Sequence, residues 1–161
     1  MEHVIHQIPP FFNHQSEILI LGSFPSVKSR EAQFFYHHPQ NRFWKVLASL
    51  TQDSLPQTIE EKKIFLLKHH IALWDVIASC DIQGSSDSSI KNAVPNDFSG
   101  ILKAAPIRRI YTNGGTAYKL YKKYCEPETG YPAVKLPSTS PANASYSLER
   151  LLKAWKVILP L

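Results

Sequence analysis

Four short apolar runs, widely spaced along the chain of 161 residues, constrain its fold most strongly. Each run is four or five residues long and ends at Gly, Asp, Asn or Pro, which is typical of buried β-strands. The stretches between the runs are too long for hairpins, so we expect the strands to pair in parallel through helical crossovers. The predicted strands are residues 18–21, 71–74, 107–111 and 133–136.

Helical patterns fill the intervals between these strands. Phe43, Val46 and Leu50 recur at helical spacing, and Thr58 with Glu61 forms a capping box at the start of a second helix. The predicted helices are residues 43–50, 58–69, 115–124 and 147–158. This alternation predicts an α/β fold, a three-layer α/β/α sandwich around a four-stranded, mostly parallel central sheet.

Length and composition suit one globular domain, residues 1–161, since 43% of the residues are hydrophobic and 19% are charged. No apolar run approaches the ~18 to 20 residues of a membrane span, and no signal segment opens the chain, so we expect a soluble, cytoplasmic protein. Cys80 and Cys125 are too few and too far apart for a thiolate metal centre. Neither a metal nor another cofactor is expected.

The net charge of +5 is unevenly distributed. Residues 1–80 hold seven basic and seven acidic residues, so the whole excess follows residue 80. Between Phe98 and Cys125 there are six basic residues and no acid, a distribution that attracts a polyanion. Charge alone fits either a nucleic-acid surface or an ordinary solvated face.

Polar loops follow all four predicted strands. In open parallel sheets, ligands bind outside the carboxyl ends of the strands. Here these ends lead into Gly-, Pro- and Ser-rich segments at residues 22–26, 75, 113–115 and 137–143. Any one segment could be an ordinary turn, but their convergence on one edge favours a binding site there.

The most distinctive motif runs from residue 21 to residue 44: a strand, a Gly-x-x-Pro turn, an aromatic loop, and His-Pro-x-Asn-Arg-Phe-Trp at residues 38–44. It resembles the first motif of the uracil-DNA glycosylase superfamily, especially the mismatch-specific uracil/thymine branch. Residues 137–143 resemble the loop with which these enzymes hold the DNA backbone and fill the space left by a flipped base. Residues 73–77, 84–89 and 94–98 are similar to the hypoxanthine-DNA (deoxyinosine) glycosylase branch.

Two departures from the superfamily pattern concern catalysis. Uracil-specific branches carry an Asp or Asn after the first strand to orient water, whereas Ser23 and Phe24 stand here. The His or Asn of the last-strand motif is replaced by Leu136 or Ser138, depending on alignment. The resemblance therefore implies that Asn41 is the catalytic residue, its carbonyl holding water and its amide NH2 donating to the base. Asn41 could instead only cap the helix that follows.

The resemblance also implies a pocket for the flipped base. Asp75 could accept a hydrogen bond from N1–H of hypoxanthine and repel the N1 lone pair of adenine, although Asp75 could equally cap a turn. Tyr36 would stack on the base and Phe24 would form the opposite wall, unless both are core residues. The expected base-binding residues are Gly22, Ser23, Phe24, Tyr36, Asp75 and Asn113.

The DNA backbone is expected to bind beside this pocket. Hydroxyl groups and backbone amides of the last loop would hold phosphates, and the residues after them would fill the vacated stack. Basic residues near this edge would add sequence-independent affinity. The expected DNA-binding residues are Pro25, Ser26, His38, Ser138, Thr139, Ser140, Pro141, Ala142, Asn143 and Lys119.

These features and the resemblance predict a monofunctional DNA repair glycosylase that removes a flipped deaminated base, hypoxanthine before others, and leaves an abasic site. The absence of a Lys nucleophile from the matched motifs argues against lyase activity. The alternatives are a uracil/thymine mismatch glycosylase or a non-catalytic domain that binds DNA lesions. A nucleotide-binding domain is disfavoured because both common phosphate-loop motifs are absent. DNA is the expected partner, and a monomer the expected state.

Overall fold

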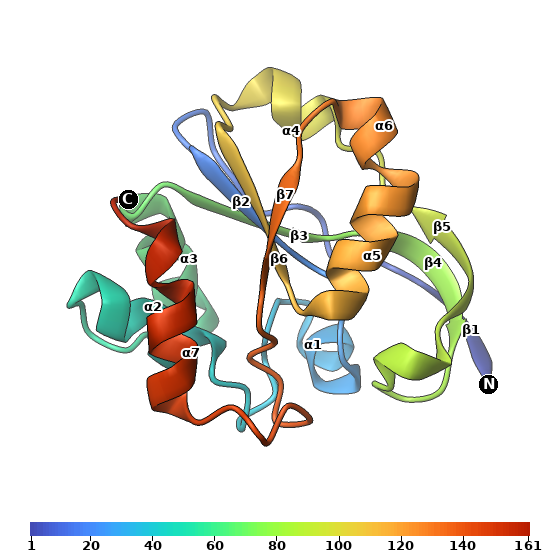
Figure 1. Cartoon of the computed structure of the whole chain (residues 1–161), viewed down its shortest axis with the longest axis horizontal. Helices are drawn as coiled ribbons and strands as arrows, with labels where there is room; N and C mark the ends of the chain where they lie inside the picture. Colours follow the sequence, from blue (N-terminus) through green and yellow to red (C-terminus); the bar gives the residue numbers. More distant parts are fainter.

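A computed structural model describes all residues, 1–161, and its centre is a four-stranded parallel sheet in the order β3-β2-β6-β7 (Figure 1). The strands are β2 (Ile18–Gly22), β3 (Ile71–Asp75), β6 (Arg109–Asn113) and β7 (Ala133–Leu136). The expected parallel sheet is confirmed. Strand β6 lies two residues later than predicted, because residues 107 and 108 lead into the sheet before the paired strand begins at Arg109.

Helices cover both faces of this sheet. Five of them are α2 (Phe43–Thr51), α3 (Ile59–Lys68), α4 (Ser99–Ala104), α5 (Gly115–Tyr124) and α7 (Leu148–Trp155). Helices α2, α3 and α7 pack on one face, while α4 and α5 pack on the other (Figure 1). The three-layer sandwich is therefore confirmed. No helix has the length and apolar content needed to cross a membrane.

Alternating side chains of the strands build two hydrophobic cores. In β2, Ile18 and Ile20 join the core under α2, α3 and α7, whereas Leu19 and Leu21 join the core under α4 and α5. Every residue of β2 is buried, as expected for a central parallel strand covered on both faces. Burial of both faces fixes the register, because a slip of one residue would exchange the two cores.

A second sheet was not predicted. It contains β1 (Glu2–Ile5), β4 (Ile77–Ile82) and β5 (Lys91–Pro95), paired antiparallel in the order β1-β4-β5. Strand β4 follows β3 after a single residue, so the polypeptide leaves the central sheet and enters the small one directly. Helix α4 was also not predicted, nor were the short elements α1 (Val27–Ala32), α6 (Glu126–Thr129) and a 3₁₀ turn at Asp87–Ser89. The helix predicted over residues 147–158 ends as α7 at Trp155 and continues as a 3₁₀ turn at Lys156–Ile158.

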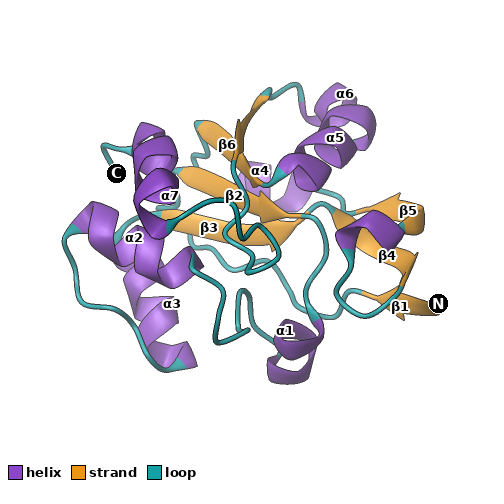
Figure 2. Cartoon of the chain, turned by 60° about the horizontal axis from the view of Figure 1, so that its bottom comes forward, coloured by secondary structure: helices purple, strands orange, loops and turns teal.

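The parallel arrangement brings the carboxyl ends of all four central strands to one edge. Figure 2 turns this edge forward and shows the loops after β2 and β7 lying in front of the sheet, with α1 below them. The loop between β4 and β5 reaches the same edge from the small sheet (Figure 2). Five segments that are distant in sequence therefore surround one region.

Candidate functional site

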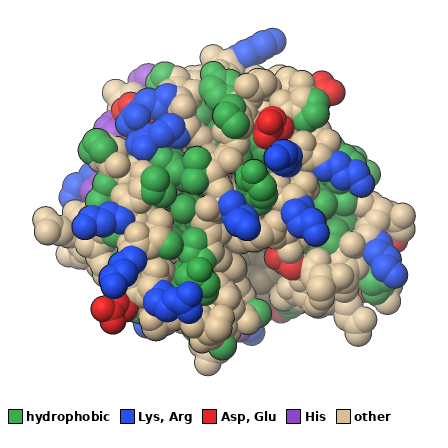
Figure 3. Space-filling view, in the orientation of Figure 1, with side chains coloured by type: hydrophobic (Ala, Val, Ile, Leu, Met, Phe, Trp, Pro, Cys, Tyr) green, Lys and Arg blue, Asp and Glu red, His purple; other side chains and the backbone are tan.

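A cavity of about 820 Å³ opens at this edge, within the size range of small-molecule sites. Its walls come from the loops after β2, β6 and β7, the end of β3, and the loop between β4 and β5. Figure 3 shows a hollow on this side, with acidic atoms at its border. Among the expected residues, those that line the cavity are Gly22, Ser23, Phe24, Pro25, Ser26, Tyr36, Asn41, Asp75, Asn113, Ser138, Thr139, Ser140, Ala142 and Asn143.

The floor of the cavity depends on the missing side chain of Gly22. A Cβ atom at this position would overlap the Asp75 carboxylate and would lie 3.1 Å from the Tyr36 hydroxyl. Gly22 and Asp75 are paired in register on neighbouring strands. Only glycine leaves room for the carboxylate and the phenol to converge over β2.

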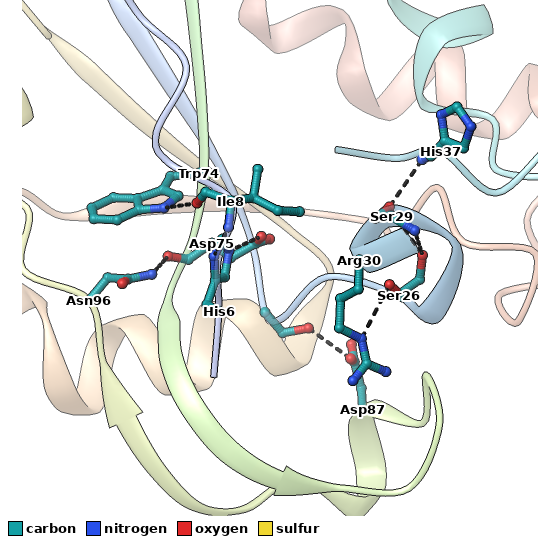
Figure 4. Close-up of polar contacts among 11 residues, drawn as sticks. His6, Ile8, Ser26, Ser29, Arg30, His37, Trp74, Asp75, Asp87 and Asn96 are labelled. Carbon is teal, nitrogen blue, oxygen red and sulfur yellow. Dashed lines mark hydrogen bonds and ion pairs between the residues drawn. The ribbon is translucent and has the colours of Figure 1, made fainter. Parts of the chain in front are cut away.

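Asp75 is held by a histidine from the other end of the chain. His6 lies 2.8 Å from the carboxylate through Nε2, and both side chains are almost fully buried (Figure 4). His6 Nδ1 accepts a hydrogen bond from the Ile8 amide at 3.2 Å, so the ring proton is on Nε2 and is donated to Asp75 Oδ2. The other oxygen, Oδ1, faces the space above Gly22. The carboxylate therefore contacts the ring of His6 and caps no turn.

The N-terminal segment, which precedes β2, explains how His6 reaches this position. The amide of His6 donates to the Ala78 carbonyl at 2.7 Å, which continues the pairing of β1 with β4. Phe11 then exchanges two backbone hydrogen bonds with Leu73, and the Trp74 indole donates to the Ile8 carbonyl. The chain from Glu2 to Phe11 thus runs antiparallel first along β4 and then along β3.

Tyr36 presents its hydroxyl to the floor and packs its ring on the core. Its ring stacks on Phe43 with centroids 3.9 Å apart, and the Trp44 indole donates to its backbone carbonyl. The hydroxyl is buried without a hydrogen-bond partner in the chain. Burial, and then the charge of Asp75, raise the pKa of Tyr36, so the phenol keeps its proton as a donor. One ring face is occupied by Phe43, which leaves the remaining surface for a ligand.

Asn41, Thr139 and Asn113 form one hydrogen-bonded network. The Asn41 carbonyl oxygen accepts from the Phe43 amide at 2.9 Å and from the Thr139 hydroxyl at 2.8 Å. The Asn113 side chain binds Thr139 twice, accepting from its amide and donating to its hydroxyl, each at 3.0 Å. Because both lone pairs of the Asn41 carbonyl are used, the carbonyl cannot also hold the water molecule that the resemblance implied. The Asn41 NH2 group has no partner in the chain and lines the cavity.

The position of Thr139 contradicts its expected role at the DNA backbone. Its side chain is 0% exposed, and its hydroxyl connects Asn41 to Asn113. The amides of residues 139, 140, 142 and 143 all donate within the protein, so the loop offers none of them to a phosphate. Ser138 and Ser140 accept from two of these amides and keep their hydroxyl protons free to donate.

Arg42 holds the loop after β7 in place. Its guanidinium donates to the backbone carbonyls of Ser140, Asn143 and Tyr146, and its own amide donates to the Thr139 carbonyl. A planar guanidinium with several fixed donors suits such multiple contacts. The start of α2 and the loop after β7 therefore form one rigid wall.

Asp87 contributes a second carboxylate, from the loop between β4 and β5. It accepts a hydrogen bond from the Ser23 hydroxyl at 2.8 Å. The residue as a whole is exposed, but its carboxyl group faces the cavity. Desolvation there raises the pKa of the carboxyl group. The Ser23 hydrogen bond lowers this pKa, and the charge of Asp75 raises it. Asp75 and Asp87 are the only carboxylates of the cavity wall, and Lys135 is the only cation.

Three expected site residues lie outside the cavity wall. His38 accepts a hydrogen bond from the Gln40 amide within its own loop, Pro141 is partly buried in the last loop, and Lys119 is exposed on α5. Among the other basic residues, Arg108 pairs with Glu17 and Arg109 donates to carbonyls near the C-terminus, both at the opposite end of β6. Basic side chains are nevertheless spread over the face that carries α7, β7 and α5 (Figure 3).

Sequence reasoning missed His6, Asp87, Arg42 and Lys135 as residues of the site. His6 and Asp87 reach the site through the small sheet, which the apolar pattern did not predict. Arg42 stands inside the matched motif at residues 38–44, and Lys135 stands just before the one at residues 137–143; this position was the only available signal. No three His, Cys, Asp or Glu side chains gather in a geometry that could hold a metal ion.

The fold and the cavity define an α/β protein with a mostly polar pocket at the carboxyl ends of a parallel sheet, where such folds bind their ligands. The family model for the uracil DNA glycosylase superfamily matches residues 9–159. The chain belongs to this superfamily, so the resemblance inferred from its motifs is confirmed.

Individual relatives agree with this assignment. A hypoxanthine DNA glycosylase of Methanosarcina acetivorans is 37% identical over 143 residues, covering 88% of this chain and 90% of the relative. A protein of the same description from Methanosarcina barkeri is 32% identical, covering 91% and 92%. A solution NMR structure of a Methanosarcina acetivorans protein, provisionally described as a uracil DNA glycosylase, superposes with a TM-score of 0.81 at 34% identity, covering 95% of this chain and 94% of that one.

The buried network predicts a difference between two substitutions of Thr139. Thr139→Val removes the hydroxyl, leaves the Asn113 NH2 group without its acceptor, and is expected to lower the free energy of unfolding by about 1–3 kcal/mol. Thr139→Ser keeps both hydrogen bonds and loses only a methyl group, about 1 kcal/mol. Urea denaturation of both variants measures this; a Val variant as stable as the wild type would show that the network is not needed.

Proposed function

We propose that the protein is a monofunctional DNA glycosylase that hydrolyses the N-glycosidic bond of hypoxanthine in DNA and leaves an abasic site. The observation that supports this proposal most directly is the floor of the cavity. There Asp75 Oδ1 is a fixed acceptor and the Tyr36 hydroxyl is a donor without a partner, and the two lie side by side over Gly22. The relatives described as hypoxanthine DNA glycosylases support the same substrate. Uracil and thymine also present an N–H donor beside a carbonyl oxygen, N3–H and O4, so the floor disfavours adenine, and the choice of hypoxanthine rests on the relatives.

The floor matches one edge of hypoxanthine. This base presents N1–H as a donor beside O6 as an acceptor, which pairs with Asp75 Oδ1 and the Tyr36 hydroxyl. Adenine presents the reverse pattern, because its N1 is an acceptor that the carboxylate repels. Guanine shares N1–H and O6, so its exclusion rests on its stable pairing with cytosine, since extrusion costs least for a mispaired base.

His6 defines what Asp75 offers to the base. Its Nε2–H occupies Oδ2, so the carboxylate cannot rotate, and Oδ1 remains the free acceptor. Because both groups are buried, the hydrogen bond acts in a medium of low dielectric constant, where it orients the carboxylate strongly. His6 is thus a positioning residue for base recognition.

Asn41 serves the departing base through its NH2 group alone. Cleavage leaves negative charge on the base, and a preorganised donor aimed at it stabilises the transition state. The carbonyl of Asn41 is held by Phe43 and Thr139, which fixes the direction of the NH2 group. Capping and catalysis therefore coexist in one side chain.

The nature of the product depends on whether an amine reaches the floor of the cavity. Lyase chemistry requires an amine nucleophile, and the one amine of the wall, Lys135, is an exposed side chain lying 5.9 Å from the Tyr118 ring centroid, outside the floor. We therefore propose hydrolysis without strand cleavage. Since one chain supplies every wall of the cavity, we propose a monomer that acts on cellular DNA in the cytoplasm.

The proposed activity is tested with end-labelled duplexes that carry one hypoxanthine, uracil, xanthine or mismatched thymine. We expect release of hypoxanthine, with strand breaks appearing only after alkali treatment. Breaks before alkali would contradict the monofunctional proposal, and release of uracil or thymine without hypoxanthine would favour the mismatch-specific alternative. Binding without release from any duplex would leave the non-catalytic alternative.

Substitution of Asp75 tests base recognition. In Asp75→Asn the amide oxygen is expected to turn toward His6 Nε2–H, which places an NH2 donor against N1–H of the base. We expect a loss of roughly 10²-fold in the rate of hypoxanthine release, since a buried donor is left opposite a donor. Asp97→Asn is the matched control, because Asp97 is exposed and only caps the start of α4. A wild-type rate for Asp75→Asn would contradict the assignment.

Substitution of Asn41 separates capping from catalysis. Asn41→Asp keeps the acceptor for Phe43 and Thr139 but replaces the NH2 donor with an oxygen that repels the departing base. We expect a thermal midpoint close to that of the wild type and a rate lower by about 10²- to 10³-fold. Calorimetry and single-turnover excision measure the two effects. An active Asn41→Asp variant would reduce the residue to a helix cap.

A further inference from the structure

The two carboxylates of the cavity lie at different depths. Asp75 is 3% exposed at the floor, where His6 holds it. Asp87 belongs to an exposed loop, and its carboxyl group faces the cavity from the mouth. A base on the floor would leave its sugar near the mouth, so the bond to be broken lies closer to Asp87 than to the floor.

The loop that carries Asp87 is attached to the turn after β2 and to α1 at three points. The Val27 amide donates to the Ser85 hydroxyl at 2.9 Å, Arg30 donates to the Gly84 carbonyl at 2.7 Å, and Ser23 donates to Asp87 Oδ1 at 2.8 Å. Figure 4 shows Asp87 beside Arg30 and the turn that leads into α1. The carboxylate is therefore held in place before any substrate arrives.

No other group of the cavity is suited to activate water. The Asn41 carbonyl is fully engaged, and the raised pKa of Tyr36 makes its phenol a donor at neutral pH. Ser23 is a weak base that donates its proton to Asp87. Asp75 is engaged with His6 on one oxygen and lies at the floor. Asp87 Oδ2 makes no hydrogen bond within the chain.

We propose that Asp87 is a further catalytic residue, the general base that orients and deprotonates the water in glycosidic hydrolysis. This inference rests on the proposed glycosylase function and adds to it the missing water-activating group. The Ser23 hydroxyl holds Oδ1, which leaves Oδ2 as the oxygen free to bind water. Asp87 belongs to the loop between β4 and β5, whereas Ser23 belongs to the turn after β2. The hydrogen bond between them therefore joins two separate loops.

The proposed step balances as an ordinary hydrolysis. The bond between C1′ and the base nitrogen breaks, and its electron pair leaves with the base. The water oxygen forms the new bond to C1′, and its proton passes to Asp87 Oδ2. The base then takes up one proton from solvent, and Asp87 releases its own proton to solvent, so the products are free base and an abasic sugar.

The electrostatic environment supports this role. Desolvation of the Asp87 carboxyl group raises its pKa, and the charge of Asp75 raises it further, against the lowering effect of the Ser23 hydrogen bond. A carboxylate with a raised pKa is a stronger base, and general bases act best when their pKa lies close to the working pH. The same negative charge would stabilise the positive sugar of the transition state.

The test compares Asp87→Asn, Asp87→Ala and a control, Asp81→Asn. Asn at position 87 can still accept the Ser23 hydrogen bond, so the loop is preserved while the base is lost. Asp81 lies on β4 and binds only His3 and Asn92, so its substitution makes the same change of charge outside the cavity. Three quantities are measured for each: the single-turnover rate of base release, the affinity for a duplex with uncleavable 2′-fluoro-deoxyinosine, and the thermal midpoint.

We expect Asp87→Asn to lose at least about 10²-fold in rate. Its affinity should stay within about threefold of the wild type, and its thermal midpoint within about 2 °C. Sodium formate should partly restore the rate of Asp87→Ala, because a small carboxylate can occupy the vacated space. Asp81→Asn should match the wild type. An Asp87→Asn rate within threefold of the wild type would overturn the proposal, as would a loss of rate matched by a loss of affinity.

The wild type in the same experiment separates this proposal from the proposed substrate. If the wild type releases another base, the choice of hypoxanthine fails, and the Asp87 variants are judged on the base that is released. If the wild type releases none, both proposals fail.

Discussion

The convergence of Asp75 and Tyr36 above Gly22 is the arrangement on which the rest of the site depends. It needs the register of β2 against β3, because Asp75 must lie directly beside a residue without a side chain. It also needs the small sheet, because pairing of β1 with β4 brings His6 to the second oxygen of Asp75. A buried carboxylate without that partner would be costly, so fold and recognition share one set of contacts.

Much of this architecture follows from local sequence patterns. Each central strand is a short apolar run, and the helices between them carry their own periodicity and caps; Thr58, for example, accepts the amide of Glu61 as the capping box predicts. Parallel pairing then requires the four following loops to share one edge. For this reason the sequence alone places Gly22, Asn41 and Asp75 in one region, and the structure brings them into one cavity.

The remaining features depend on contacts between distant residues that no local pattern encodes. His6 is 69 residues from Asp75, and Asp87 is 64 residues from Ser23. Strands β4 and β5 show no regular alternation, since bulges interrupt their pairing, so the sheet that delivers both residues left no periodic signal. The direction of a side chain in a loop could not be predicted from the sequence either. Only the structure shows that Thr139 faces inward.

The central claim is that the floor over Gly22 recognises the N1–H and O6 edge of the flipped base. A crystal structure with a duplex that contains 2′-fluoro-deoxyinosine, which resists cleavage, tests this most directly. The account predicts N1 about 2.7–3.2 Å from Asp75 Oδ1, with O6 at the Tyr36 hydroxyl and the Asn41 NH2 group beside the rings. A base held outside this cavity, or one that turns another edge toward Asp75, would contradict the account.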